Sequence, residues 1–143
     1  MTPFLLDVNV LISLVRPKHS AHEKVMQWFR SAGRTQWATC AFTESGLVRV
    51  VSHPRFSAQA ITVGEALQLL SELTALPGHQ FWSLGFGFVE AVKPIQDRFW
   101  GHQQATDSYL LALAIKNQGK LVTQDRGLLY LAGEEFAEHV LLL

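Results

Sequence analysis

The sequence predicts an α/β protein: three layers, α/β/α, around a mostly parallel central sheet of about four to five strands. Short apolar segments typical of buried strands alternate with longer segments in which apolar residues recur every three or four positions. No Asn-Gly or similar hairpin signal joins successive strands, so crossover connections are expected. The length of 143 residues, with no linker-like stretch, predicts one domain over residues 1–143.

The first strand is the apolar run that ends at Asp7. Val8, Leu11, Ile12 and Val15 then follow at helical spacing, which predicts a helix directly after the strand. The early position of this run makes it a candidate for the central strand. A carboxylate at the carboxyl end of a parallel strand lies where open α/β sheets bind ligands.

Two helices and a strand are predicted next. Ser20, with Glu23 three residues later, predicts a capping box that opens a helix ended by Gly33. Residues 36–40 form a short second strand. Residues 42–51 form the following helix, which stops before Pro54 and leads into a loop that reaches Phe56.

The second half continues the same alternation. Thr62 opens a helix that ends at Pro77-Gly78, and residues 79–83 form a third strand. A weak helix disturbed by Pro94 follows at residues 88–100, before the strongest helix, which Thr106 caps. The predicted elements of this last part are the helix at residues 107–117, a strand at 121–123, a short helix at 126–131 and a final strand at 140–143.

Composition narrows the class of protein. Lys plus Arg equals Asp plus Glu at 12 each, so a nucleic acid would be held by local basic patches and not by net charge. The charged fraction of 17% lies below the average of about 25%, and we expect another chain to cover part of the apolar surface. Cys40 is the only cysteine, which excludes a disulfide framework. With no long apolar run or signal peptide, we expect a cytoplasmic protein without membrane association.

Four acidic residues occupy positions that the predicted fold brings to one edge of the sheet. Asp7 and Asp125 each follow a predicted strand, whereas Asp107 and Glu44 lie on apolar helical stripes. An ionised carboxylate on an apolar stripe is costly unless something compensates its charge, and a divalent cation would do so. Oxygen ligands without Cys or His suit Mg²⁺ or Mn²⁺. Without metal, like-charge repulsion should raise the pKa of at least one of these acids.

Each of these acids, taken alone, also fits a structural role, as a helix N-cap, a partner of the helix dipole or a solvated charge. It is their combination that favours a metal site. Such clusters typically serve phosphoryl chemistry, in which the metal holds a phosphate oxygen and lowers the pKa of a bound water.

The segments around these four acids resemble the acidic motifs of the PIN domain, and in particular those of VapC-type toxins of type II toxin–antitoxin systems. They are Leu-Leu-Asp-Val-Asn-Val at Asp7, Thr-Glu-Ser-Gly-Leu-Val at Glu44, Ala-Thr-Asp-Ser-Tyr-Leu at Asp107 and Val-Thr-Gln-Asp-Arg-Gly at Asp125. The resemblance covers nearly the whole chain. It implies a metal-dependent endoribonuclease that hydrolyses RNA phosphodiester bonds, forms a homodimer and is neutralised by a VapB-type antitoxin.

The resemblance also implies roles for individual residues. Asp7, Glu44, Asp107 and Asp125 would be the catalytic acids and the ligands of Mg²⁺, with Mn²⁺ as a substitute. Asp7 and Asp107 would be the usual direct ligands, and Asn9 and Thr123 would support the site. For substrate binding, Arg126 and Arg16 are candidates for holding RNA phosphates, although solvated surface charge is the ordinary role of such side chains.

Two other functions are compatible with these residues. One is a catalytically inert PIN-like regulatory module, held in a complex by its apolar surface; metal should then leave its melting temperature unchanged. The other is a small-molecule phosphohydrolase on a similar sheet. Against the second, Asp7-Val8-Asn9 lacks the second aspartate that the haloacid-dehalogenase type carries two residues after the first.

Overall fold

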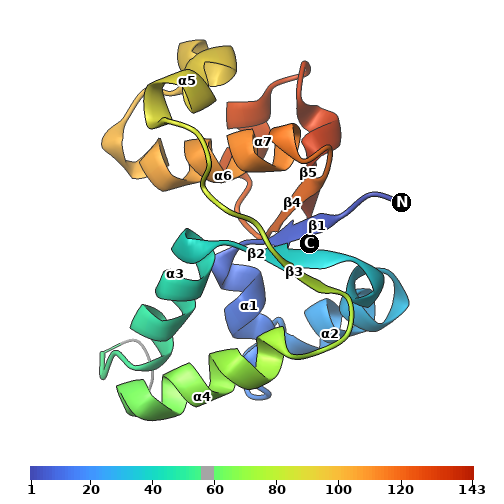
Figure 1. The fold of residues 1–143 in the computed structure, drawn as a ribbon, viewed down its shortest axis with the longest axis vertical. Helices are drawn as coiled ribbons and strands as arrows, with labels where there is room; N and C mark the ends of the chain where they lie inside the picture. The colour runs from blue at the N-terminus through green and yellow to red at the C-terminus, as the bar shows by residue number, and fades with distance from the viewer. Residues whose placement is uncertain (56–59) are drawn as a thin grey trace.

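The computed structural model describes residues 1–55 and 60–143 and has the predicted three-layer α/β/α architecture (Figure 1). Phe56, the end of one predicted loop, lies outside the described residues. The sheet has five strands in the order β3-β2-β1-β4-β5, and all neighbouring pairs are parallel. The strands are β1 (Phe4–Leu6), β2 (Trp37–Thr39), β3 (His79–Phe81), β4 (Lys120–Thr123) and β5 (Val140–Leu142).

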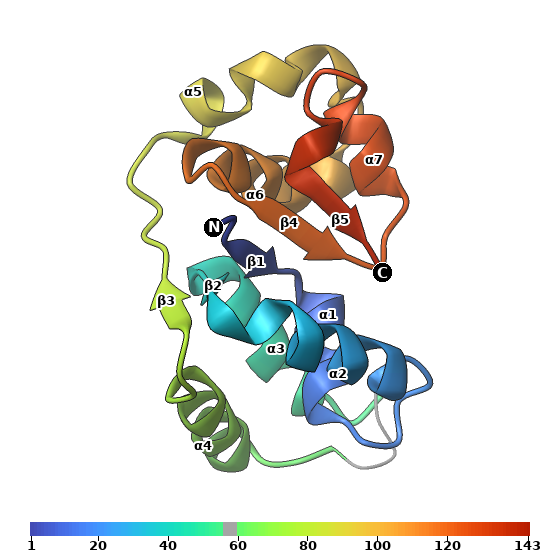
Figure 2. The same cartoon turned by 90° about the vertical axis from the view of Figure 1, so that its right-hand side faces the viewer.

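Helices cover both faces of the sheet, as Figure 2 shows. One layer contains α1 (Val8–Val15), α2 (His22–Ser31), α3 (Ala41–Val51) and α4 (Val63–Thr74). The other contains α5 (Phe88–Val92), α6 (Ala105–Lys116) and α7 (Gly127–Ala132). Short 3₁₀ turns connect them: η1 (Gly33–Thr35), η2 (Lys93–Arg98), η3 (His102–Gln104) and η4 (Ala137–His139). No helix of the described residues is both long and apolar enough to cross a membrane.

The core has two halves, one on each face of the sheet, and alternate residues of a strand contribute to different halves. In β1, Leu5 packs into the cluster beneath α6 and α7, whereas Leu6 packs into the cluster beneath α1 and α3. In β4, Leu121 and Val122 divide in the same way. Successive side chains of a strand point to opposite faces, so a sheet buried on both faces needs continuous apolar strands. This requirement explains the continuous apolar runs at the centre of the sheet, Phe4-Leu5-Leu6 in β1 and Leu121-Val122 in β4.

The order of the strands creates one natural site for a ligand. The chain builds β1, β2 and β3 outward to one side and then returns to add β4 and β5 on the other side. The two directions meet between β1 and β4, with β1 at the centre as predicted. In open α/β sheets the crevice at such a switch point, outside the carboxyl ends of the strands, is where ligands bind. Asp7 is the residue that directly follows β1.

The capping box predicted at Ser20 and Glu23 is wrong. Helix α2 begins at His22 with Ala21 as its N-cap, and no side chain caps it. The preceding turn is closed by His19, whose Nδ1 accepts the backbone N–H of Ala21 at 3.0 Å. A histidine acceptor, two residues before Ala21, is present where a serine cap was predicted. The Ser-x-x-Glu spacing alone could not exclude this alternative.

Two further boundaries differ from the prediction. Thr106 does not cap the strongest helix, because η3 leads directly into α6, which starts at Ala105. The weak helix at residues 88–100 is two elements, α5 and the 3₁₀ turn η2, and Pro94 lies in the first turn of the second. Proline lacks the N–H that would continue an α-helix, so the change of helix type at this position follows from the residue itself.

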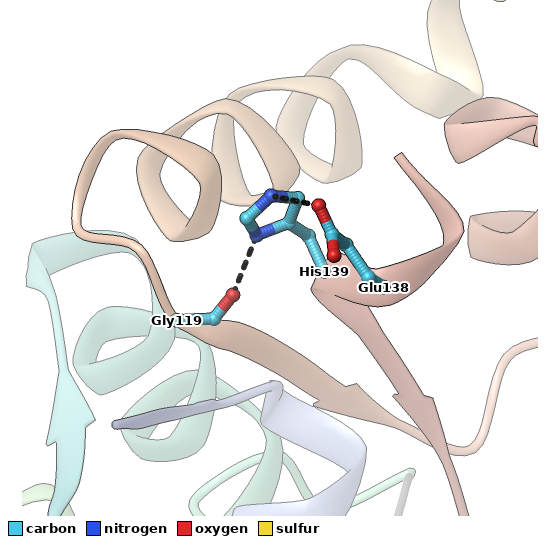
Figure 3. A network of polar contacts seen from close by, with 3 residues as sticks. All are labelled: Gly119, Glu138 and His139. Carbon is cyan, nitrogen blue, oxygen red and sulfur yellow. Dashed lines mark hydrogen bonds and ion pairs between the residues drawn. The ribbon is translucent and has the colours of Figure 1, made fainter. Parts of the chain in front are cut away.

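Polar side-chain contacts connect the C-terminal elements of the chain to one another and to η2. The Nδ1–H of His139, in η4, donates to the carbonyl oxygen of Gly119 at 2.8 Å, and its Nε2 lies 3.6 Å from Glu138 Oε1 (Figure 3). This contact ties the segment before β5 to the turn before β4. The guanidinium of Arg98 donates to the carbonyl oxygens of Leu131 and Ala132, at 2.8 and 3.0 Å, at the end of α7.

Candidate functional site

Asp7 lies between β1 and α1, and it is one of the few buried polar residues, with 7% of its surface exposed. Its Oδ1 accepts the N–H of Val8 at 2.7 Å. Asp7 is therefore the N-cap of α1, which is the ordinary structural role of an aspartate at the start of a helix. Its Oδ2 accepts the hydroxyl of Thr123 at 2.8 Å. Burial raises the pKa of Asp7, the two hydrogen bonds oppose that shift, and the charge of Asp125 adds to it.

Thr123 joins β1 to β4 at the site. Besides its bond to Asp7, its Oγ1 accepts the backbone N–H of Asp125 at 3.0 Å and the amide of Asn9 at 3.4 Å. Asn9 in turn accepts the backbone N–H of Gln124 on its Oδ1 at 3.2 Å. The register of the sheet places these groups together, because Leu6 pairs with Val122 one residue before Asp7 and Thr123.

Asp107 lies in the first turn of α6, half-buried, while the other residues of its helical stripe, Leu110, Leu111 and Ala114, are buried. Its pKa is raised to about 7, first by burial and then by the negative charges of Asp7 and Asp125. Within the described residues its carboxylate accepts no hydrogen bond. Asp107 is therefore the acid with least compensation for its charge, as its position on an apolar stripe predicted.

Asp125 completes a group of three interacting carboxylates. It is exposed in the turn after β4, and its Oδ1 accepts the N–H of Gly127 at 2.8 Å. Its negative charge contributes to the raised pKa values of both Asp7 and Asp107. The three aspartates come from the β1–α1, η3–α6 and β4–α7 junctions, and they lie at the switch point of the sheet.

Glu44 lies with a different set of partners. It is in the first turn of α3, half-buried, and its Oε2 accepts the hydroxyl of Thr39 at 2.6 Å. The same hydroxyl lies 2.8 Å from Nε2 of His79. Burial lowers the pKa of His79, and the charge of Glu44 partly opposes this shift. The structure thus brings three of the four predicted acids together and places the fourth against β2 and β3.

The donor set fits a hard divalent cation. Among the described residues, no three side chains of the His, Cys, Asp and Glu types form a preassembled metal cage. Mg²⁺ does not require one, because it keeps several waters and binds proteins through one or two carboxylates. Burial and neighbouring carboxylates raise the pKa values of Asp7 and Asp107, and a bound cation would offset this cost of ionisation. Asp7, Asp107 and Asp125 could therefore hold Mg²⁺ or Mn²⁺.

The two predicted arginines occupy different places. Arg126 directly follows Asp125, is exposed and lies at the start of α7. Arg16 lies at the other end of α1 from Asp7, about 13 Å along a helix of this length. Its guanidinium donates to the carbonyl oxygen of Val51 at 3.2 Å, joining the ends of α1 and α3.

Sequence reasoning missed Thr39 and His79. Thr39 had a usable signal, because it ends a buried parallel strand and so lies at the same edge as Asp7. His79 had none, since its contact with Thr39 depends on the pairing of β2 with β3. Gly46 was also missed; a Cβ there would come within 2.5 Å of Val8 Cγ2, so glycine lets α3 approach α1.

The fold and the site define the protein as a parallel α/β domain with an acidic site at the switch point of its sheet. The chain belongs to the PIN domain family, whose model matches residues 4–134. Within that family it groups with the VapC proteins. It is 39% identical to Ribonuclease VapC44 of Mycobacterium tuberculosis over 124 residues, 87% of each chain. It is 38% identical to Ribonuclease VapC38 of the same organism over 128 residues, 90% of this chain and 89% of the relative.

Two solved structures share the fold. The structure of FitAcB from Neisseria gonorrhoeae aligns with a TM-score of 0.66 and 20% identity, over 98% of this chain and 96% of that one. The structure of VapBC2 from Rickettsia felis, bound to a DNA fragment from their promoter, aligns with a TM-score of 0.56 and 12% identity, over 87% and 88%. At these sequence identities, the two solved structures are evidence for the fold of this chain alone.

Proposed function

We propose that the protein is a metal-dependent endoribonuclease that hydrolyses RNA phosphodiester bonds in the cytoplasm, as the toxin of a toxin–antitoxin pair. The observation that carries the proposal is the group of Asp7, Asp107 and Asp125 at the switch point, where the charge of Asp125 raises the pKa of Asp7 and the charges of Asp7 and Asp125 raise that of Asp107. The family supports it, since the relatives reported above are named as ribonucleases.

Asp7 and Asp107 are the proposed direct ligands of Mg²⁺ or Mn²⁺, with Asp125 and Glu44 acting through waters. When bound, the cation supplies Lewis-acid stabilisation of the phosphate and lowers the pKa of a water. The chain itself supplies orientation. Thr123 and Val8 hold the two oxygens of Asp7 in fixed directions, and α6 presents Asp107 from the opposite helical layer.

Arg126 is the proposed group for an RNA phosphate. It is exposed, directly follows Asp125 and has no ion-pair partner among the described residues, so its guanidinium can turn toward a bound strand. Guanidinium groups bind phosphate oxygens through paired hydrogen bonds. Because the net charge of the chain is zero, such a local contact would be needed to hold RNA beside an acidic site.

We further propose a VapB-type antitoxin and a second copy of the chain as partners. Helix α4 supports this, because Ala66 is its only buried residue while Val63 and Leu67 are 59% and 54% exposed. Val63 and Leu67 lie one helical turn apart, and contiguous exposed apolar residues are typical of surfaces that bind other chains. Solution mass measurement of the co-expressed and the isolated protein should give a retained partner and a dimer; a stable lone monomer would contradict both.

The deciding experiment is RNA cleavage by the purified protein with and without Mg²⁺. Wild type should cut only with the cation, and Asp107→Asn should be inactive. Asp97→Asn is the matched control, because Asp97 is an exposed aspartate in η2, and it should cut like wild type. If wild type cuts no RNA and Mg²⁺ leaves its melting temperature unchanged, the chain is an inert binding module and the proposal fails.

A further inference from the structure

We propose that His79 is a positioning residue which, through the hydroxyl of Thr39, fixes the carboxylate of Glu44. The functional part of this inference rests on the proposed ribonuclease activity, in which Glu44 belongs to the site. The structural part, the hydrogen-bond arrangement of His79, Thr39 and Glu44, does not depend on that activity. Glu44 differs from the three aspartates because its contacts lie on β2 and β3, at the start of the other half of the sheet.

The direction of the hydrogen bonds follows from the chemistry of the hydroxyl. Thr39 has one hydroxyl proton, and it donates to Glu44 Oε2 at 2.6 Å. The 2.8 Å contact between Thr39 Oγ1 and His79 Nε2 must then be donated by the imidazole. This assigns the Nε2–H tautomer to a neutral His79. The result is a chain of donors that runs from the imidazole through the hydroxyl to one carboxylate oxygen.

The sheet holds the imidazole in place. Trp37 is the register partner of His79 in the β2–β3 pair, and Thr39 lies two residues further along β2 on the same face. The imidazole packs against the fully buried Trp37 ring, with centroids 4.7 Å apart. Thr39 is itself fully buried. If the imidazole turned away it would lose its packing against Trp37, and Thr39 is enclosed by the core, so packing favours the orientation of both donors.

The consequence is a defined orientation for a flexible side chain. A glutamate in a first helical turn ordinarily samples several rotamers, but the bond at Oε2 restricts Glu44. Its Oε1 accepts no hydrogen bond from the described residues and remains available for a water or a ligand. Groups that orient an acidic site residue in this way typically change affinity or activity by about 10–100-fold when removed.

Four single variants separate hydrogen bonding from packing. Thr39→Val removes the hydroxyl at nearly constant volume, and His79→Phe removes the donor while keeping a ring against Trp37. Thr39→Ser and His79→Gln keep a hydroxyl and an N–H donor, and they are the matched controls. The melting temperature of each variant is measured first, and comparisons are made between variants that unfold cooperatively.

The first readout needs no metal and no RNA. Nitrogen-15 NMR of the histidine side chains in the metal-free protein should show the Nε2–H tautomer for His79 in wild type and in Thr39→Ser. Thr39→Val should shift this tautomer balance, because the proton loses its acceptor. A wild-type Nδ1–H tautomer, or spectra of Thr39→Val identical to wild type, would overturn the proposal whatever the protein does to RNA.

The second readout is a double-mutant cycle on RNA cleavage. His79→Phe should lower kcat about tenfold with KM unchanged, and His79→Gln should restore most of the loss. In a Glu44→Gln background the same His79→Phe change should have little further effect, because His79 acts through Glu44. Equal losses in both backgrounds would overturn the proposal. Wild type that cuts no RNA would defeat the proposed function, and the NMR result would then decide the positioning role by itself.

Discussion

The hydroxyl of Thr123 donates a hydrogen bond of 2.8 Å to Oδ2 of Asp7, which joins two residues that lie 116 positions apart. This bond links the ends of β1 and β4 at the switch point of the sheet. It orients the buried carboxylate at the end of β1, and the same hydroxyl also accepts the backbone N–H of Asp125. One threonine therefore connects the two strands that contribute Asp7 and Asp125.

Thr123→Val should destabilise the protein. The substitution keeps the shape but leaves a buried carboxylate oxygen without its donor, which costs about 1–3 kcal/mol. Urea denaturation of the metal-free protein measures the loss. Thr123→Ser, which retains the hydroxyl, should lose less than half as much. Equal losses for the two variants would show that the methyl packing of Thr123 matters and its hydrogen bond does not.

The stability of the metal-free protein should fall as the pH rises from about 4 to about 7. Because the pKa of Asp107 is raised from 3.8 to about 7, folded protein retains a proton that unfolded protein releases. This contribution is complete below pH 3.8 and is lost as pH passes the folded-state pKa. Thermal unfolding across this range should show a steeper decline for wild type than for Asp107→Asn. Parallel curves would contradict the raised pKa.

Mg²⁺ should raise the melting temperature of wild type, and more strongly as the pH rises past 7, because Asp107 then loses the proton that competes with the cation. A cation that binds the folded form alone stabilises it in proportion to the logarithm of its concentration once the site is saturated. Asp7→Asn combined with Asp107→Asn should remove the effect, whereas Asp97→Asn should retain it. A shift of equal size in the double variant would place the cation elsewhere on the protein.

Gly46→Ala should destabilise wild type by about 1–3 kcal/mol, because the new methyl meets Val8 and overpacks the α1–α3 contact. In a Val8→Ala background the sign should reverse, since space is then available and alanine favours the helix by up to about 1 kcal/mol. Gly64→Ala, at an open position in α4, is the control and should be neutral or stabilising. Chemical denaturation of these variants gives the comparison.

Arg98→Met should cost about 1–3 kcal/mol, because two carbonyl oxygens at the end of α7 lose their charged donor. The methionine keeps much of the apolar stem, so the measured loss reports the hydrogen bonds. Arg34→Met, at an exposed arginine in η1, should change the free energy of unfolding by less than about 0.5 kcal/mol. A similar loss in both variants would argue against a specific role for Arg98.

The central strand and the positions of Asp7 and Asp107 could be predicted because they depend on local patterns. A continuous apolar run that ends in Asp7 indicates a buried strand and its carboxyl end, and the stripe containing Asp107 indicates a half-buried acid. The contact of Thr39 with His79 could not be predicted, because a strand pairing in space creates it. The capping box predicted for α2 was wrong for a related reason. In the turn before α2, the backbone N–H of Ala21 donates to His19 and no bond to Ser20 replaces it, and the spacing of residues in the sequence does not reveal such turn geometry.

The position of β1 between β2 and β4 has a consequence for synthesis. The strand that leads into Asp7 is translated more than a hundred residues before its neighbour β4. Until then a nascent chain lacks Thr123 and Asp125 and holds no assembled acidic group. The carboxylates of this site can therefore meet only late in translation, after β4 and the turn that follows it have been made.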